Sequence, residues 1–139
     1  MDDFANRYLL VMDPRFIKVV VNGKGESVGM MITMPDISKG IQKSRGYLFP
    51  FGFIPVLTAG KKTKQLNALL VAIRPDYQDK GIANVLAGAV LDSAREAGLT
   101  HVDGHLMMET NKKVRAEMDF MGGKVYKRFR IFQRDIKST

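Results

Sequence analysis

The chain has 139 residues, of which 45% are hydrophobic and 26% are charged, a composition typical of an ordinary globular protein. This length suits one domain with a sizeable core, so two full domains and wholesale disorder are both disfavoured. The chain has no cysteine, which excludes disulfides, thiolate catalysis and cysteine-ligated metal centres. Lysine and arginine outnumber aspartate and glutamate by 22 to 14, a net charge of +8, so we expect an anionic ligand or partner.

Patterns typical of export and membrane insertion are missing from the sequence. The N-terminal residues lack the basic-then-apolar order of a signal peptide. The longest apolar stretch, residues 47–60, is short and is interrupted by Pro50 and Pro55. We therefore expect a soluble, cytoplasmic protein that does not insert into a membrane.

The first predicted element is a β-hairpin. Apolar, β-branched residues 16–21 and 27–34 flank the sequence Asn22-Gly23-Lys24-Gly25, which is typical of a turn between antiparallel strands. A short amphipathic helix is predicted over residues 36–45, because Ile37 and Ile41 repeat at helical spacing.

The next segment, residues 47–57, holds four aromatic residues between prolines and a glycine. This composition predicts an irregular segment and no regular helix. It is either a loop folded over the core or a flap that lines an apolar acceptor or partner site. The basic residues 61–64 that follow are predicted to form a solvated turn.

The second half of the chain alternates between strands and helices. A strand is predicted over 66–73, covered on both faces, and is followed by a helix that begins at Ile82 and stops at Gly98. A second strand is predicted over 101–108. The helix predicted after it is capped by Thr110 or Asn111 and has a buried side formed by Val114, Met118 and Met121, and the last predicted element is an extended basic strand over 124–136. A strand–helix–strand unit of this kind forms a right-handed parallel crossover. The predicted fold class is α/β (α+β), with a mixed, mostly antiparallel sheet around that central crossover.

The junction between the strand over 66–73 and the long helix carries the clearest chemical signal. Pro75 ends the strand, and Gln78-Asp79-Lys80-Gly81-Ile82-Ala83 leads directly into the helix. The first N–H groups of a helix lack internal partners and carry partial positive charge, so this turn predicts a pyrophosphate site. Gly81 and Ala83 let phosphates approach the backbone, and Lys80 or Gln78 adds a side-chain donor. Taken alone, the same residues are also compatible with an ordinary capped turn.

The same turn resembles the signature of the GNAT acetyltransferase superfamily: arginine or glutamine, two residues, glycine, one residue, then glycine or alanine. Gln78 to Ala83 match this signature, Ile73-Arg74-Pro75 match its lead-in, and Asn111 is similar to the family's asparagine near the pantetheine arm. The resemblance covers about residues 16–134. It implies a single GNAT-like domain over 1–139, with a reduced N-terminal segment over 1–15 and an insertion or flap over 35–65.

The resemblance also implies that acetyl-CoA binds as co-substrate where the strands over 66–73 and 101–108 splay apart. The backbone of Val71 and Ile73 would hydrogen-bond the pantetheine amides, and the turn over 78–83 would hold the pyrophosphate. An N–H near Val71 or Ala72 would polarise the thioester carbonyl, which stabilises the charge that develops during acyl transfer. The net positive charge then has an explanation in the phosphates of CoA, near which the helix starts place Lys80, Lys112, Lys113 and Arg115.

Two features depart from the family pattern. Family members often carry a tyrosine general acid four residues before the glycine that ends the second helix, and this position is Met118 here. Tyr126 could substitute for it, or could simply be an aromatic packed on the sheet. The family's N-terminal strand and two helices, which help to form the acceptor pocket, have at most about 15 residues here. The chain is then a fragment, a reduced form, or one subunit of a homodimer that completes the pocket.

A general base is sought on the strand over 101–108. Strand periodicity places His101, Asp103, His105 and Glu109 on one face. His105 or Glu109 could remove a proton from an amine, directly or through water. Each histidine could equally be a hydrogen-bonded structural residue, and Glu109 could compensate the dipole of the following helix. Two histidines four residues apart on a strand do not suit a shared metal, so we expect no metal site.

The main hypothesis is an N-acyltransferase that moves an acetyl group from acetyl-CoA to a small-molecule or protein amine by direct attack in a ternary complex. A second hypothesis is a catalytically weak acyl-CoA-binding or assembly module. A third is a nucleic-acid-binding domain, based on basic residues interleaved with aromatic residues over 124–134. The same alternation is typical of a lysine-guarded edge strand, so nucleic acid is the least favoured partner.

Overall fold

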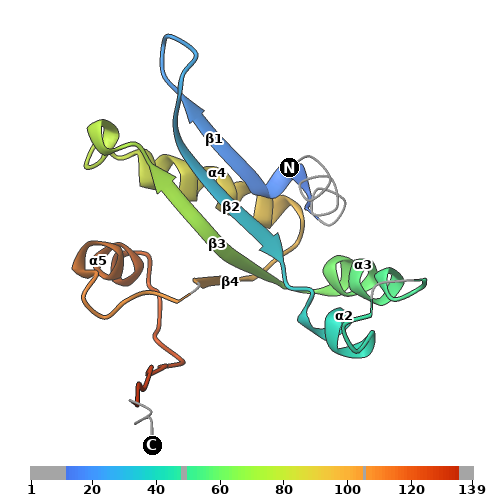
Figure 1. Cartoon of the computed structure of the whole chain (residues 1–139). Coiled ribbons are helices and arrows are strands. Elements are labelled where there is room, and N and C mark those ends of the chain that lie inside the picture. The colour runs from blue at the N-terminus through green and yellow to red at the C-terminus, as the bar shows by residue number, and fades with distance from the viewer. Residues whose placement is uncertain (1–11, 48–49, 105, 135–139) are drawn as a thin grey trace, which may run out of the picture. The chain divides into compact units, whose positions relative to one another are not determined.

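The computed structural model describes residues 12–47, 50–104 and 106–134, and the chain divides into two compact units (Figure 1). The first unit ends at His105 and the second begins at Leu106. The first contains η1 (Pro14–Phe16), β1 (Ile17–Val21), β2 (Ser27–Pro35), α2 (Ser38–Lys43), α3 (Phe53–Lys62), β3 (Gln65–Ile73), η2 (Pro75–Tyr77), α4 (Ile82–Glu96) and β4 (His101–Gly104), and the second contains α5 (Lys112–Phe120).

A single four-stranded sheet organises the first unit, in the order β1-β2-β3-β4. The pairs β1–β2 and β2–β3 are antiparallel, whereas β3 and β4 are parallel and are joined through α4. This arrangement confirms the predicted fold class, a mixed and mostly antiparallel sheet with a parallel strand–helix–strand crossover.

The hairpin β1–β2 is confirmed, and Asn22 organises its turn. The side-chain carbonyl of Asn22 accepts hydrogen bonds from the backbone N–H groups of Lys24 (2.9 Å) and Glu26 (3.0 Å). The residue that adopts the left-handed conformation is Gly25, with φ +80°. Gly25 therefore allows the chain to reverse while the Asn22 side chain satisfies the turn's amides.

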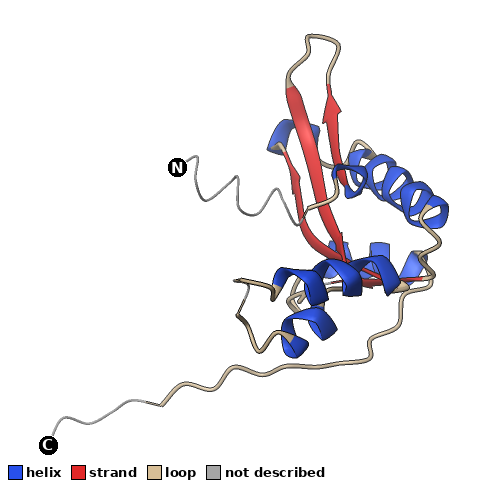
Figure 2. Ribbon diagram, turned by 90° about the vertical axis from the view of Figure 1, so that its right-hand side faces the viewer, coloured by secondary structure: helices blue, strands red, loops and turns tan. Residues whose placement is uncertain are grey.

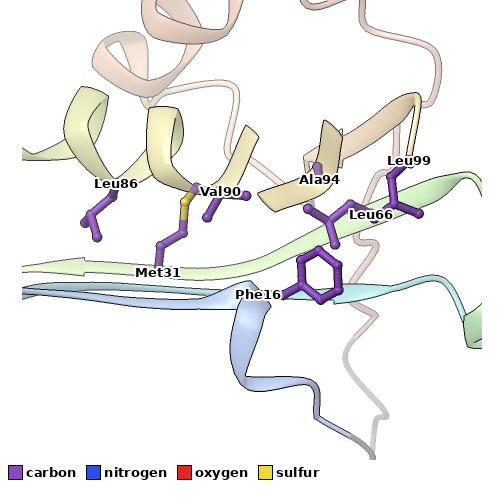
Figure 3. Packing of buried hydrophobic residues seen from close by; sticks show 7 residues of the cluster. All are labelled: Phe16, Met31, Leu66, Leu86, Val90, Ala94 and Leu99. Carbon is purple, nitrogen blue, oxygen red and sulfur yellow. The ribbon is translucent and has the colours of Figure 1, made fainter. Parts of the chain in front are cut away.

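The core lies between the sheet and α4, which runs along one face of the sheet (Figure 2). Leu86, Val90 and Ala94 of α4 are buried against the sheet, together with Phe16, Met31, Leu66 and Leu99 (Figure 3). The spacing of the three helical residues gives α4 one apolar stripe, as its sequence predicts. Burying each large side chain contributes about 1.5–3 kcal/mol, so this stripe fixes the helix on the sheet.

Two glycines shape the contact between α4 and its surroundings. A Cβ on Gly29 of β2 would lie 2.9 Å from Cγ2 of Ile82, so a larger residue at this position would require the Ile82 side chain to move. Gly98, with φ +70°, ends the helix as predicted.

The prediction that β3 is covered on both faces is wrong. Leu66 is fully buried, but Leu70 and Val71 are 50% and 47% exposed. Within the first unit α4 covers one face of the sheet, and the second half of β3 extends beyond the strand that pairs with its outer edge. The nearly continuous apolar sequence of β3 therefore does not mean that both faces of this strand are covered.

The prediction of an irregular segment over 47–57, followed by a solvated turn at 61–64, is also wrong in part. Residues 48–49 lie outside the described residues, but Phe53–Lys62 form the helix α3. Pro55 is the third residue of this helix, where a backbone N–H would have no intrahelical acceptor, so the proline is tolerated. The shorter helix predicted before it is confirmed as α2.

The helices α2 and α3 pack against each other at Gly40. This glycine is buried, and a Cβ at this position would lie 2.5 Å from Cα of Val56 in α3. The two backbones therefore approach each other too closely for any side chain at position 40.

Two strands in the C-terminal half of the chain differ from their predicted form. The strand predicted over 101–108 ends at Gly104, and residues 124–134 form no strand, whereas an extended strand was predicted there. The capping prediction is confirmed, because Oδ1 of Asn111 accepts a hydrogen bond from the backbone N–H of Val114 at 3.3 Å. The predicted buried side of α5 is not buried: Val114 and Met118 are half-buried and Met121 is 45% exposed.

Candidate functional site

The turn between β3 and α4 is built from a short 3-10 helix and a glycine. Pro75 occupies the first turn of η2, which stops β3 from continuing. The chain then passes through Gln78, Asp79 and Lys80 to Gly81, which caps α4 with φ +77°. A side chain at this φ is strained, so Gly81 suits the entry into the helix.

The start of α4 presents backbone donors that are not used within the protein. No side chain caps the helix, and the N–H groups of residues 81–84 have no acceptor among the residues that the structure describes. Gly81 is exposed, and a Cβ built on it would meet no atom within 4 Å. The helix start therefore has both the free donors and the open space that an anionic group requires.

Tyr77 holds two cations beside this helix start. The guanidinium carbon of Arg74 lies 4.8 Å from the centre of its ring, and Nζ of Lys80 lies 5.0 Å from the same centre. These distances are typical of cation–π interactions. The Lys80 ammonium is thus held over the Tyr77 ring, within the segment that leads into α4.

A polar network connects this turn to the β1–β2 hairpin. Arg74 donates two hydrogen bonds to Asp76 (2.7 and 2.6 Å) and one to Glu26 (3.4 Å). The hydrogen bond from Arg74 lowers the pKa of the Asp76 carboxyl, and its partner carboxylates raise the pKa of Arg74. Asn22 donates to the Tyr77 hydroxyl at 3.2 Å. The hairpin turn therefore supports the conformation of the 74–80 segment.

The outer edge of β3 is paired with β4 for only part of its length. The pairing ends at Ala68 and Gly104, and β3 continues to Ile73. The N–H of Arg74 donates to the carbonyl of Val28 in β2 at 2.9 Å. Because hydrogen bonding alternates along an antiparallel pair, Ala72 bonds toward β2, while Val71 and Ile73 direct their backbone groups to the opposite edge.

The side chain of Gln78 folds back onto this edge. Its Nε2 donates a hydrogen bond to the carbonyl oxygen of Ile73 at 3.3 Å. Gln78 thereby connects the end of β3 to the turn. Of the predicted cofactor residues, the first unit brings Val71, Ala72 and Ile73 next to the turn that contains Gln78, Lys80, Gly81, Ile82 and Ala83.

The predicted catalytic residues are not among the described residues of the first unit. His105 lies outside the described residues. Glu109 and Tyr126 belong to the second unit, and neither is on a strand, which corrects the prediction that Glu109 shares a strand face with His101 and Asp103.

Within the second unit, Glu109 is held by two arginines. Its carboxylate accepts a hydrogen bond from Arg128, and its backbone carbonyl accepts one from Arg115, both at 3.3 Å. Tyr126 is 64% exposed, and the Lys127 ammonium lies 5.1 Å from the centre of its ring.

Sequence reasoning missed Tyr77, Asn22 and Glu26 as parts of the site. Tyr77 lies three residues from both Arg74 and Lys80, a spacing from which the stacking could have been suspected. Asn22 lies 55 residues from Tyr77, and no local pattern connects the two. The described residues contain no group of three or more His, Asp or Glu that could hold a metal ion, and no helix among them is long and apolar enough to cross a membrane.

Comparisons with known proteins begin with sequence. No family model matches the chain. Protein YghO of Escherichia coli K12 is 25% identical over 114 residues, which cover 76% of this chain and 29% of YghO. A bacterial ceramide synthase of Caulobacter vibrioides is 24% identical over 116 residues, 79% of this chain and 30% of the synthase. The chain thus spans less than a third of the length of these curated relatives.

Similar folds occur among solved acetyltransferases. Aminoglycoside N-acetyltransferase AAC(6')-Iy in complex with CoA has a TM-score of 0.61 at 12% identity, covering 97% of this chain and 87% of the other. An acetyltransferase of Trypanosoma brucei gives 0.57 at 15% identity, with 96% and 77% covered. A ribosomal-protein-alanine N-acetyltransferase of Brucella melitensis gives 0.52 at 16% identity, with 96% and 81% covered. At these identities the likeness concerns the fold, and the chain has the fold of the GNAT acetyltransferases.

Proposed function

We propose that this protein binds acetyl-CoA and transfers its acetyl group to an amine. The observation that carries the proposal is the row of unpaired N–H groups over residues 81–84, placed in open space at the end of β3. A diphosphate is the part of CoA that such a helix start binds best. The CoA complex of the similar AAC(6')-Iy fold supports the same ligand for this chain.

The turn would bind the diphosphate through backbone and side chain together. The amides of Gly81, Ile82 and Ala83 would donate to its oxygens, and the Lys80 ammonium held by Tyr77 would add an opposite charge. Gln78 would act mainly by holding the turn against Ile73. This division of roles explains why the glutamine side chain points to the strand and the lysine remains exposed.

The free edge of β3 would bind the pantetheine arm in the manner of an added strand. Val71 and Ile73 direct their backbone groups to this edge, so both would bond the pantetheine amides. The N–H of Val71 is the better placed of the two predicted donors to the thioester carbonyl, since that of Ala72 is directed to β2. A donor fixed in the sheet stabilises the oxyanion that forms as the amine attacks.

The remaining roles follow from the resemblance to the acetyltransferase family. The Asn111 side chain uses Oδ1 as a helix cap, which leaves its Nδ2 donors for the pantetheine arm. Glu109 or His105 would accept a proton from the attacking amine, and Tyr126 would donate one to the departing thiolate in place of the family's tyrosine at position 118. The amine nitrogen gains the acyl carbon as the carbon–sulfur bond breaks, so transfer needs no cysteine and no redox partner.

Calorimetry with CoA tests the diphosphate site. Lys80→Glu reverses one charge at the turn, whereas Lys43→Glu makes the same change at an exposed position of α2. We expect Lys80→Glu to weaken CoA binding about tenfold and Lys43→Glu to change it less than about twofold. Absence of a binding signal with the unmodified protein, or equal losses in the two variants, would contradict the site. Gly81 is a poorer position for this test because its φ of +77° adds strain to any substitution.

Transfer is tested separately, with acetyl-CoA and a panel of amines. The panel includes an aminoglycoside, a polyamine and a peptide with an N-terminal alanine, since the similar folds include an aminoglycoside N-acetyltransferase and a ribosomal-protein-alanine N-acetyltransferase. Release of free thiol that depends on the amine would support the enzyme. Tight CoA binding with no transfer to any amine would support the acyl-CoA-binding module instead, in line with Met118 at the usual tyrosine position.

A second candidate function is binding of single-stranded nucleic acid by residues 124–134. Their aromatic side chains are exposed, Phe129 by 69% and Phe132 by 87%, and alternate with arginines and lysines. Exposed aromatic rings between cations can stack on bases and follow the phosphates. Oligonucleotide binding that weakens with salt and persists in excess CoA would support this function, and its absence would remove it.

A further inference from the structure

The first unit contains a cavity of about 420 Å³ at the opposite end of β3 from the diphosphate turn. It lies between η1, the end of β2, α3 and the segment after α4, with Pro35 and Thr63 beside the start of β3. The nine residues of β3 separate the two places by about 26 Å at 3.3 Å per residue. A ligand in this cavity therefore does not occupy the diphosphate turn.

The cavity wall is mainly apolar. Nine of its fourteen lining residues are apolar, among them Phe16, Met34, Leu57 and Leu99 from four different segments. Its volume lies within the range of about 300–1,000 Å³ that is usual for small-molecule sites, which are also lined mainly by apolar side chains. The shape and lining therefore suit the apolar part of a small molecule.

The one carboxylate in the wall is already neutralised. Asp13 accepts hydrogen bonds from Nε (3.0 Å) and Nη2 (2.6 Å) of Arg15 and from the Arg15 backbone N–H (3.0 Å). These hydrogen bonds lower the pKa of Asp13, so the ion pair persists at neutral pH. A cationic ligand would have to compete with Arg15 for this carboxylate.

Lys61 provides the remaining charge. It lies on α3 one turn after Leu57, lines the cavity, and has no ion-pair partner among the described residues. With Asp13 and Arg15 paired, the wall has a net charge of one positive unit. An apolar wall with one unpaired ammonium is complementary to an aliphatic chain that ends in an anion.

We propose that this cavity binds an aliphatic chain with a single anionic end group, such as a fatty carboxylate, with the chain against Leu57 and Phe16 and the anion at Lys61. This site is separate from the proposed diphosphate turn and does not depend on acetyl transfer. The helix that carries Leu57 and Lys61 packs closely on α2 at Gly40 and Val56.

The test compares C12 ligands by calorimetry on the full chain, at concentrations below micelle formation. Laurate carries an anion, dodecylamine a cation, and dodecanol no charge. We expect laurate to bind at least about tenfold more tightly than dodecylamine, with dodecanol between them. Amide NMR shifts on adding laurate should map to residues 57–63, whereas CoA should shift residues 78–84.

Two matched pairs of variants locate the site on α3. Lys61→Glu should weaken laurate binding about tenfold, and Lys62→Glu, one residue outside the wall, less than about twofold. Leu57→Asp should weaken it more than about tenfold, and Ile54→Asp, which is 51% exposed and does not line the cavity, should change it little. Circular dichroism checks that each variant folds. If Leu57→Asp does not fold, the comparison of Lys61→Glu with Lys62→Glu decides the test.

The proposal is overturned by any of four outcomes. These are no saturable laurate binding up to about 1 mM, equal binding of dodecylamine, equal losses with Lys61→Glu and Lys62→Glu, or laurate shifts that map to residues 78–84. Failure of CoA binding with intact laurate binding would leave this site in place and remove only the proposed transfer function.

Discussion

The two units of the chain use similar apolar patterns with very different results. Among the residues that the structure describes, all nine buried hydrophobic side chains lie in the first unit, including Leu66, Leu86 and Val90. No described residue of the second unit is buried, and Phe120 and Ile131 are 90% and 100% exposed. α4 has a sheet to pack on, whereas α5 has no such surface within its own unit. A helical apolar stripe thus produces a core only where a second apolar surface is available.

The largest expected effect contrasts one residue from each unit. Leu86→Ala removes a side chain that is 1% exposed, so we expect the free energy of unfolding to fall by about 2–5 kcal/mol. Phe120→Ala removes a side chain that is 90% exposed and should change it by less than about 0.5 kcal/mol. Urea unfolding followed by circular dichroism measures both. A comparable loss at Phe120 would show that the second unit has a buried core in solution.

A pair of glycines tests how tightly the first unit is packed. A Cβ on Gly29 would lie 2.9 Å from Cγ2 of Ile82, so Gly29→Ala should destabilise the protein by about 1–2 kcal/mol. Gly88 lies inside α4 with no atom within 4 Å of its Cβ position, so Gly88→Ala should stabilise the protein by about 0.5–1 kcal/mol. Thermal unfolding of the two variants should therefore shift in opposite directions, and shifts of the same sign would refute the packing described at Gly29.

A smaller effect concerns carboxylates in the two units. Hydrogen bonds from Ser38 and Asn67 lower the pKa of Asp36 below its ordinary value. The folded protein thus binds this proton less readily than the unfolded chain, so the stabilisation is complete at neutral pH and is lost as the pH falls below about 4. Asp36→Asn should lower stability at pH 7 by about 0.5–1 kcal/mol and reduce the loss in acid.

Glu109→Gln serves as the comparison for Asp36→Asn. Glu109 and its partner Arg128 are 68% and 71% exposed, so their ion pair is open to solvent. We expect less than about 0.5 kcal/mol of change at any pH. Unfolding measured from pH 7 to pH 3 separates the two variants, and an unchanged acid profile of Asp36→Asn would contradict the role of Asp36.

The sequence predicted elements whose signals are local. The apolar stripe of α4 and the stop at Gly98 suffice to define that helix, and the Asn22 turn defines the hairpin. The helix α3 was missed because Pro55 was read as a helix breaker, although its effect depends on its position in the first turn. The strand predicted over 124–136 depended on a partner strand elsewhere, which periodicity alone cannot supply.

The candidate site shows the same division. The turn from Gln78 to Ala83 was predicted because its backbone donors follow from the helix start itself. The contacts of Asn22 with Tyr77 and of Glu26 with Arg74, just before this turn, were not predicted, because they join residues 55 and 48 positions apart. The backbone groups of Val71 and Ile73 face the outer edge of β3 because of the register between β2 and β3. That register depends on both strands together, so neither segment of the sequence determines it alone.

The contact between Gly40 and Val56 has a consequence for the cavity beside α3. A Cβ at position 40 would lie 2.5 Å from Cα of Val56 and 2.6 Å from the carbonyl oxygen of Pro55, so an alanine there would force the backbones of α2 and α3 apart. Val56 also lines the cavity, next to Leu57. One added methyl group on α2 would therefore displace the backbone that forms part of the cavity wall.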